Sequence, residues 1–387
     1  MVGSYGICHI AWIGKKHLDR SDLKPVCVFG VSMGEHMKNP SLSTKDFYKD
    51  AFLVVCLILV STYILFSSQY SLAQHADSIV PILISTVKWT PFYWEQNRFG
   101  TLVPLICTFI ANPFLNYMAQ SFIHIFCGLS VFFLISKILV DGGELSLVIG
   151  SLSVGFFLFF FNPDAVYNFL NASQPYGISF FLFCISFLIF KNHAKNKLFL
   201  FCSFIFMLLS FWVNVSLIAF ALPLSVGFLL ISKERKYIYS SLAVILAFTI
   251  NAFYAKLFAL YNTTSFKPLP FVKWPGAVLN ITDVFNPFTQ LLQYLLLFSI
   301  GSLFVAFVIR YFRKFDENCH KIAIYKNLVV FFISFLTYTI PLFLFDHIAN
   351  FNYHPRYFLL SSILLLVFSV SLFVSSFDFI LFNKKLL

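Results

Sequence analysis

The sequence predicts an all-α polytopic membrane protein with about ten transmembrane helices. Of its 387 residues, 59% are hydrophobic and 11% are charged, whereas about a quarter of the residues in a soluble domain are charged. Apolar runs long enough to cross a lipid bilayer recur along most of the chain. Basic residues concentrate in alternating loops, so the net charge of +11 indicates cytoplasmic loops and not a nucleic-acid partner.

Residues 1–50 are polar, hold seven basic residues and lack the short apolar core of a secretory signal. They are expected to form a cytoplasmic N-terminal tail. No function is assigned to this tail, because Met33 and Met37 offer later translation starts. Residues 51–387 are expected to form the transmembrane domain.

The membrane helices are read from the apolar runs. The run at 198–231 is too long for one span and is flanked by basic clusters at both ends, so two short spans that turn near Trp212 and Asn214 are expected there. The ten expected helices are 51–68, 118–138, 145–162, 176–191, 198–212, 214–231, 237–258, 289–309, 327–345 and 357–378.

Charge counting predicts the orientation. With the tail inside, the inner segments hold 21 basic residues and the outer segments hold 6, which is a strong positive-inside asymmetry. The outer segments are then 69–117, 163–175, 259–288 and 346–356. The site is therefore expected on the outer face of a multi-pass protein, and the composition favours a bacterial inner membrane with both termini cytoplasmic.

Titratable and thiol groups exclude several classes of protein. The eight cysteines form no CxxC pair, which favours packing thiols over a disulfide framework or a zinc site. No acid lies in the middle of an expected helix, which argues against a proton- or sodium-coupled transporter. The outer acids are Asp77, Glu95, Asp164, Asp283 and Asp346.

The first outer segment, 69–117, carries the densest set of polar and aromatic residues. Asp77, in the sequence HAD that begins at His75, is expected at or just above the membrane surface. The runs 79–87 and 101–111 are apolar but too short to cross, so they are expected to form interfacial or re-entrant helices.

Between these two runs lies the sequence WTPFYWEQNRFG, which includes Trp94, Glu95, Asn97 and Arg98. Its aromatic residues are typical of a headgroup-depth belt. An ordinary interfacial loop with snorkelling polar side chains, and a simple Glu95–Arg98 helix pair, remain alternatives to a binding role.

Two further outer segments add candidates. In the second segment, Gln174 and neighbouring amide and hydroxyl groups are of the type that bind sugar hydroxyls, and Asp164 either contributes to the site or caps a short helix after Pro163. In the last segment, Arg356 follows Tyr353 and His354 at the mouth of a helix. An arginine there suits a phosphate at headgroup depth, with a snorkelling anchor as the alternative.

This arrangement resembles the GT-C superfamily of membrane glycosyltransferases, which use polyprenyl-phosphate-linked sugars. In that family the first long outer loop carries an essential acid early and contains two interfacial helices, and a basic residue near the mouth of a late helix contacts the lipid phosphate. The resemblance covers the layout from about 51 to 362, but Ser78 stands where many members have a second acid, and the soluble C-terminal domain of many members is not expected here.

The resemblance implies an inverting single displacement on a polyprenyl-phosphate-linked sugar donor, with a glycan, lipid or protein acceptor. Asp77 would be the base, and Arg356, with Arg98 or His354, would bind the donor phosphate. The resemblance implies no definite cofactor, and a divalent metal at Asp77 stays open. The substrate would contact His75, Trp94, Glu95, Asn97, Asp164, Gln174 and Tyr353.

Two other functional classes remain open. A lipid-linked glycan flippase is expected to show charges that line a cavity among the helices, and a polymerase or ligase is expected to have a larger late outer loop than 259–288. A non-catalytic scaffold or a transporter for a neutral solute predicts that Asp77 and Arg356 are replaceable.

Overall fold

The structure is a computed structural model, and everywhere that it describes regular structure the chain is helical. It divides into two compact units, Met1–Ala51 and Phe52–Leu387. Of the first unit only the opening turns of helix α1 (Thr44–Leu65) are described, and the account below concerns the second. The described residues are 44–68, 70, 78–90, 100–140, 143–174, 176–261, 319–343 and 354–382.

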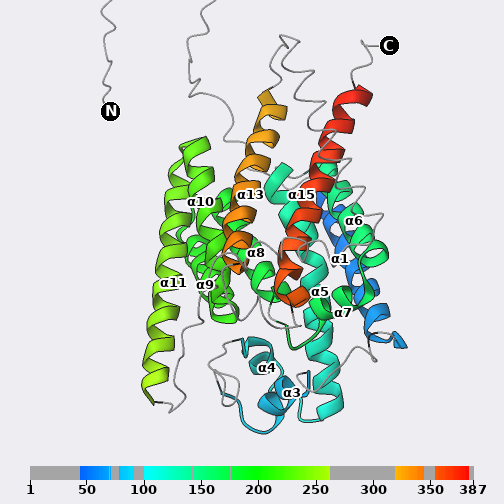
Figure 1. The fold of residues 1–387 in the computed structure, drawn as a ribbon, viewed down its shortest axis with the longest axis vertical. Helices are drawn as coiled ribbons and strands as arrows, with labels where there is room; N and C mark the ends of the chain where they lie inside the picture. Colours follow the sequence, from blue (N-terminus) through cyan, green and yellow to red (C-terminus); the bar gives the residue numbers. More distant parts are fainter. Residues whose placement is uncertain are drawn as a thin grey trace, which may run out of the picture. The chain divides into compact units, whose positions relative to one another are not determined.

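Six helices of the described residues are long and apolar enough to cross a membrane. This supports a multi-pass integral membrane protein. Nine of the ten expected spans have a helix in the structure (Figure 1), and the tenth, 289–309, lies outside the described residues. The helices that match expected spans are α1, α5 (Pro113–Val140), α6 (Gly143–Phe160), α8 (Tyr176–His193), α9 (Lys197–Val213), α10 (Ile218–Ser232), α11 (Arg235–Tyr261), α13 (Cys319–Phe343) and α15 (His354–Phe382).

Helix α5 begins at Pro113, five residues before its apolar run was expected to start. The extra turn has a capping signal that hydropathy does not register. The Asn112 side-chain oxygen accepts hydrogen bonds from the backbone N–H groups of Phe114 and Leu115, at 2.9 and 3.1 Å. Proline at the first helical position is also favourable, because its missing N–H would have no partner there.

The run at 198–231 folds as two helices, as predicted. Helix α9 ends at Val213, and a single 3-10 turn, η2 (Val215–Leu217), leads into α10. Asn214 makes this turn: its side-chain oxygen accepts hydrogen bonds from the Ser216 N–H and hydroxyl, at 3.2 and 2.7 Å. A polar residue that satisfies local donors is what allows the chain to reverse inside an apolar run.

Serine pairs join neighbouring helices in the middle of the bundle. The Ser186 hydroxyl of α8 donates to the Ser203 carbonyl of α9, and the Ser203 hydroxyl donates back to the Ser186 carbonyl, both at 2.7 Å. Ser225 of α10 and Ser240 of α11 are paired at 3.0 Å. Helices in lipid gain no hydrophobic attraction for one another, so small residues and hydrogen bonds of this kind hold them together.

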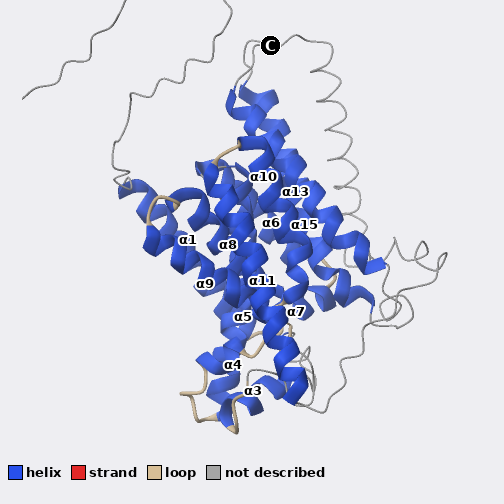
Figure 2. Ribbon diagram, turned by 90° about the vertical axis from the view of Figure 1, so that its left-hand side faces the viewer, coloured by secondary structure: helices blue, strands red, loops and turns tan. Residues whose placement is uncertain are grey.

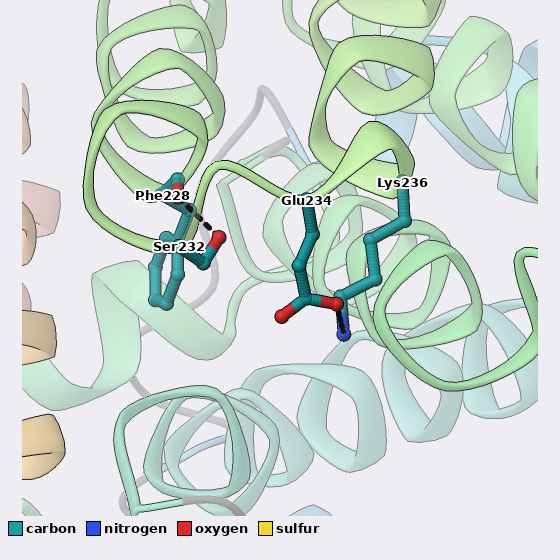
Figure 3. A network of polar contacts seen from close by, with 4 residues as sticks. All are labelled: Phe228, Ser232, Glu234 and Lys236. Carbon is teal, nitrogen blue, oxygen red and sulfur yellow. Dashed lines mark hydrogen bonds and ion pairs between the residues drawn. The ribbon is translucent and has the colours of Figure 1, made fainter. Parts of the chain in front are cut away.

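Polar side chains make local contacts at the end of the bundle that carries the expected inner loops. Between α10 and α11, Glu234 and Lys236 form an ion pair at 2.9 Å, and the Ser232 hydroxyl donates to the Phe228 carbonyl at 2.6 Å (Figure 3). The last turn of α5 is tied down by Lys191 of α8, whose ammonium donates to the Ile138 carbonyl at 3.0 Å. A basic side chain is favourable at a helix C-terminus.

Two short helices of the first outer segment, α3 (Ile79–Thr86) and α4 (Leu102–Ile106), lie at the other end of the bundle (Figures 1 and 2). They confirm that the expected runs 79–87 and 101–111 hold short helices, although the second stops at Ile106 and continues as turns. The 171–174 segment and the α9–α10 turn lie at the same end.

Candidate functional site

Helix α3 is fixed to the first turns of α5 by amide side chains. The Asn116 amide donates to the Ser85 hydroxyl oxygen at 2.8 Å and to the Cys107 carbonyl at 2.8 Å, and so links α3 to the turn after α4. One turn further on, the Gln120 amide donates to the Pro81 carbonyl at 3.2 Å. Since Asn116 and Gln120 are fully buried, these bonds form in a water-poor environment and hold α3 in one place.

The start of α3 is fixed by a different contact. The Ser78 hydroxyl donates to the side-chain oxygen of Asn171 at 3.0 Å, and the same oxygen accepts the Ser173 backbone N–H at 2.9 Å. Ser78 is 2% exposed and Asn171 is fully buried. The first and second outer segments therefore meet at the Ser78–Asn171 hydrogen bond, and Ser78 directly follows Asp77 in the sequence.

The second outer segment contributes the short helix α7 (Pro163–Leu170) and the buried turn 171–174. The helix expected after Pro163 is confirmed, but its N-cap residue is Asn162, and Asp164 lies exposed in the first turn. Gln174 is buried at 5% exposure. His124 of α5, also buried, interacts with the Gln174 backbone, so this turn is held from both α3 and α5.

An aromatic and apolar contact joins α4 to the α9–α10 turn. The Trp89 indole N–H donates to the Thr101 carbonyl at 3.3 Å. Its ring meets the edge of Trp212 with centroids 6.5 Å apart. The α4 residues Leu102 and Val103 pack in one buried cluster with residues of α5, α8 and α9. Apolar burial thus anchors α4 where hydrogen bonds anchor α3.

Burial also sets the chemistry of the thiol in this region. Cys107 is 2% exposed, and burial in apolar surroundings raises the pKa of its thiol to about 11. A neutral, buried thiol is neither a nucleophile nor a metal ligand, which fits the expected packing role. Among the residues with described side chains, no three His, Cys, Asp or Glu residues lie close enough to hold a metal ion.

Most of the residues predicted for the site fall outside the described part of the chain. His354 and Arg356 lie together in the first turn of α15, which begins three residues before the expected helix. Only Asp164 and Gln174 have described side chains. The others, Asp77, His75, Trp94, Glu95, Asn97, Arg98 and Tyr353, lie outside the described residues.

The structure adds residues that the sequence interpretation did not single out. Asn116, Gln120 and His124 form a polar stripe on α5, each one turn after the last. Ser78 is the fourth residue, and it bonds to Asn171 in the turn that His124 also contacts. The i, i+4, i+8 spacing of polar residues at the start of an otherwise apolar helix was a readable signal of a buried polar face. Together these amides and hydroxyls can orient a loop and donate or accept hydrogen bonds.

Comparison of the chain with protein-family models, with curated proteins and with solved structures found no match. What can be said about function therefore depends on the residues themselves and on the geometry of this end of the bundle.

Proposed function

We propose that the protein is a membrane glycosyltransferase that moves a sugar from a polyprenyl-phosphate donor to a glycan, lipid or protein acceptor on the outer face of the membrane. The observation that carries the proposal is the buried Ser78–Asn171 hydrogen bond at 3.0 Å. It fixes the chain beside Asp77 to the second outer segment, at the end of the bundle where α3 and α4 are docked.

The chemistry needs a base and a stabilised leaving group. The acceptor hydroxyl oxygen attacks the anomeric carbon, the bond from that carbon to the phosphate oxygen breaks, and the acceptor proton passes to Asp77. The leaving group is the polyprenyl phosphate, whose negative charge grows as the bond breaks. In the proposal Arg356, with Arg98 or His354, stabilises that charge, and the single displacement inverts the anomeric centre.

The geometry offers two kinds of support. The first outer segment contains two short helices that contact α5, in line with the resemblance. In addition, Arg356 lies in the first turn of α15, and its helix reaches α7, which precedes the Asn171 turn. A donor with a long apolar tail would stay in the bilayer while its phosphate and sugar reach this end.

The test is a mass profile of lipid-linked and envelope glycans in a deletion strain that carries wild type, Asp77→Asn or Asp283→Asn at matched membrane abundance. Asp283 is an outer acid with no assigned role and serves as the control. We expect wild type and Asp283→Asn to restore a glycan one sugar larger, and Asp77→Asn to fail. Full restoration by Asp77→Asn would remove the catalytic assignment, and an unchanged profile in the deletion strain would favour a transporter or scaffold.

A further inference from the structure

At the end of the bundle that carries the expected inner loops, the α8–α9 loop and the α10–α11 loop lie side by side. Phe187 of α8 meets Phe228 of α10 and Tyr237 of α11, with ring centroids 5.3 and 6.1 Å apart. One turn beyond Phe187, the Lys191 ammonium lies 5.8 Å from the centre of the Phe228 ring, which is within the range of a cation–π contact. These contacts join the ends of three helices, so their two loops form one surface.

This surface is basic. The α10–α11 loop contains the acid Glu234, but Glu234 is already paired with Lys236 at 2.9 Å (Figure 3). Four other basic side chains of the two loops are exposed and form no ion pair with a described residue. The four, called the basic surface below, are Lys195, Lys197, Lys233 and Arg235.

Local helix stability does not account for three of these cations. Lys233 ends α10 in a left-handed backbone conformation, with φ 54° and ψ 19°, where glycine is usual because other side chains are strained. Lys197 and Arg235 are the first residues of α9 and α11, although the partial charge at a helix N-terminus favours acids. The positive-inside rule accounts for basic residues in such loops, and a negatively charged partner that touches both loops would in addition offset these local costs.

Exposed apolar side chains continue from the basic surface along the helices. Leu198 directly follows Lys197, and Ile231 lies two residues before Lys233; their side chains are 67% and 37% exposed. Further exposed apolar residues within two turns of the loops are Phe199, Phe201, Leu230, Ile238 and Leu242. In a bilayer such side chains contact acyl chains, which places the neighbouring cations at headgroup depth.

From these two adjoining features, we propose that the basic surface binds the headgroups of acidic phospholipids in the adjacent leaflet. A phospholipid offers a phosphate to the cations and acyl chains to the apolar side chains, whereas a soluble anion or an acidic peptide would use the cations alone. Each Lys or Arg near an anionic membrane surface strengthens binding roughly fivefold. The proposal does not depend on the proposed transferase activity.

The test uses the full-length protein in detergent and native mass spectrometry, which counts the lipids that stay bound and yields affinities from a titration. The probes are phosphatidylglycerol and phosphatidylcholine with the same acyl chains, and inorganic phosphate serves as a soluble competitor. One double variant is Lys195→Gln with Lys197→Gln, and the other is Lys233→Gln with Arg235→Gln.

A matched control removes the same charge at the other end of the bundle. It combines Lys88→Gln and Lys256→Gln, since both lysines are exposed there. A further variant, Glu234→Gln, changes the charge in the opposite direction, because it removes an acid from between the cations and frees Lys236. Simple damage to the loop would not strengthen lipid binding.

We expect wild type to bind phosphatidylglycerol at least about tenfold more tightly than phosphatidylcholine. Each double variant should weaken phosphatidylglycerol binding about tenfold or more, and the control should stay within about twofold of wild type. Glu234→Gln should strengthen binding severalfold, and inorganic phosphate should not displace the lipid.

Four results would overturn the proposal. Equal affinity for the two lipids, or an equal loss in the control, would reduce the basic surface to a topological signal. A loss from one double variant alone would show that the two loops do not form one site. Displacement by inorganic phosphate would indicate a site for a soluble anion, and weaker binding by Glu234→Gln would show that charge does not govern binding.

Discussion

The backbones of two long helices approach closely at Gly177 of α8 and Gly128 of α5, and this approach allows a sharp test of the fold. A Cβ atom added at Gly177 would lie 3.0 Å from the Gly128 Cα and 3.3 Å from the Gly128 N. Carbon atoms in optimal contact are about 3.5–4.0 Å apart. The obstruction is backbone, so no side-chain rotation can relieve it, and α5 and α8 must separate by roughly half an ångström or more.

Gly177→Ala is therefore expected to destabilise the protein. Overpacking costs about 1–3 kcal/mol, and the better helix propensity of alanine recovers at most about 1 kcal/mol. The net loss should lower the thermal midpoint of the purified protein in detergent by a few degrees, measured as the fraction that stays monodisperse after heating.

Gly155→Ala is the matched control, because a Cβ atom at Gly155 of α6 would have nothing within 4 Å. That variant gains helix propensity without a clash, so its midpoint should equal or exceed that of wild type. If Gly177→Ala proves as stable as Gly155→Ala, the α5–α8 contact is wrong and the geometry of the 171–174 turn, which leads directly into α8, must be revised.

Three further predictions concern other parts of the described structure. Asn327→Leu removes the amide that donates to the Leu139 carbonyl at 2.9 Å, and the unpaired carbonyl should cost about 1–3 kcal/mol; a midpoint equal to wild type would contradict this bond. Ser186→Ala and Ser203→Ala should each destabilise, but the double variant should lose at least about 0.5 kcal/mol less than the sum, and strict additivity would argue against the reciprocal pair. Burial raises the pKa of the Cys107 thiol to about 11, so its thiolate fraction at pH 8 is about one in a thousand. Alkylation followed by peptide mass analysis should therefore mark Cys107 in denaturant only. Rapid labelling of the folded protein would show that the thiol is accessible.

Hydropathy and local signals were sufficient to predict most of the helices that the structure describes. The two short spans in 198–231 and the turn at Asn214 were predicted from length and flanking charge, and the structure has α9, η2 and α10 there. The short helices α3 and α4 were predicted in the same way. The start of α5 was missed because it depends on the Asn112 cap, which adds a turn that is not continuously apolar.

The candidate site was harder to predict, since its described part depends on contacts between residues far apart in the sequence. Gln174 was predicted to contact the substrate because its side-chain amide can bind sugar hydroxyls. In the structure Gln174 is buried in the turn that contacts of Asn171 and His124 stabilise. Ser78 was noticed only as the position where a second acid is absent. No local pattern shows that its hydroxyl reaches a residue 93 positions away.

Buried polar groups without a partner, other than serine hydroxyls, gather at the end of the bundle that carries α3 and α4. Several buried hydroxyls of helical serines make no hydrogen bond, but a serine in a helix can usually turn toward a carbonyl of the preceding turn. Among the described residues other than serine, the buried side-chain polar atoms without a partner are in Thr101, Gln120, Trp212 and Asn214. All four lie where α3 and α4 meet α5 and the α9–α10 turn.

An unpaired buried polar group costs about 1–3 kcal/mol, so a protein selected only for stability would replace such residues with apolar ones of similar shape. Natural proteins retain such local costs at functional or strained sites, so these residues mark this end of the bundle as a candidate site. A transferase needs a fixed acid and fixed hydrogen-bonding groups beside a sugar that arrives from the membrane.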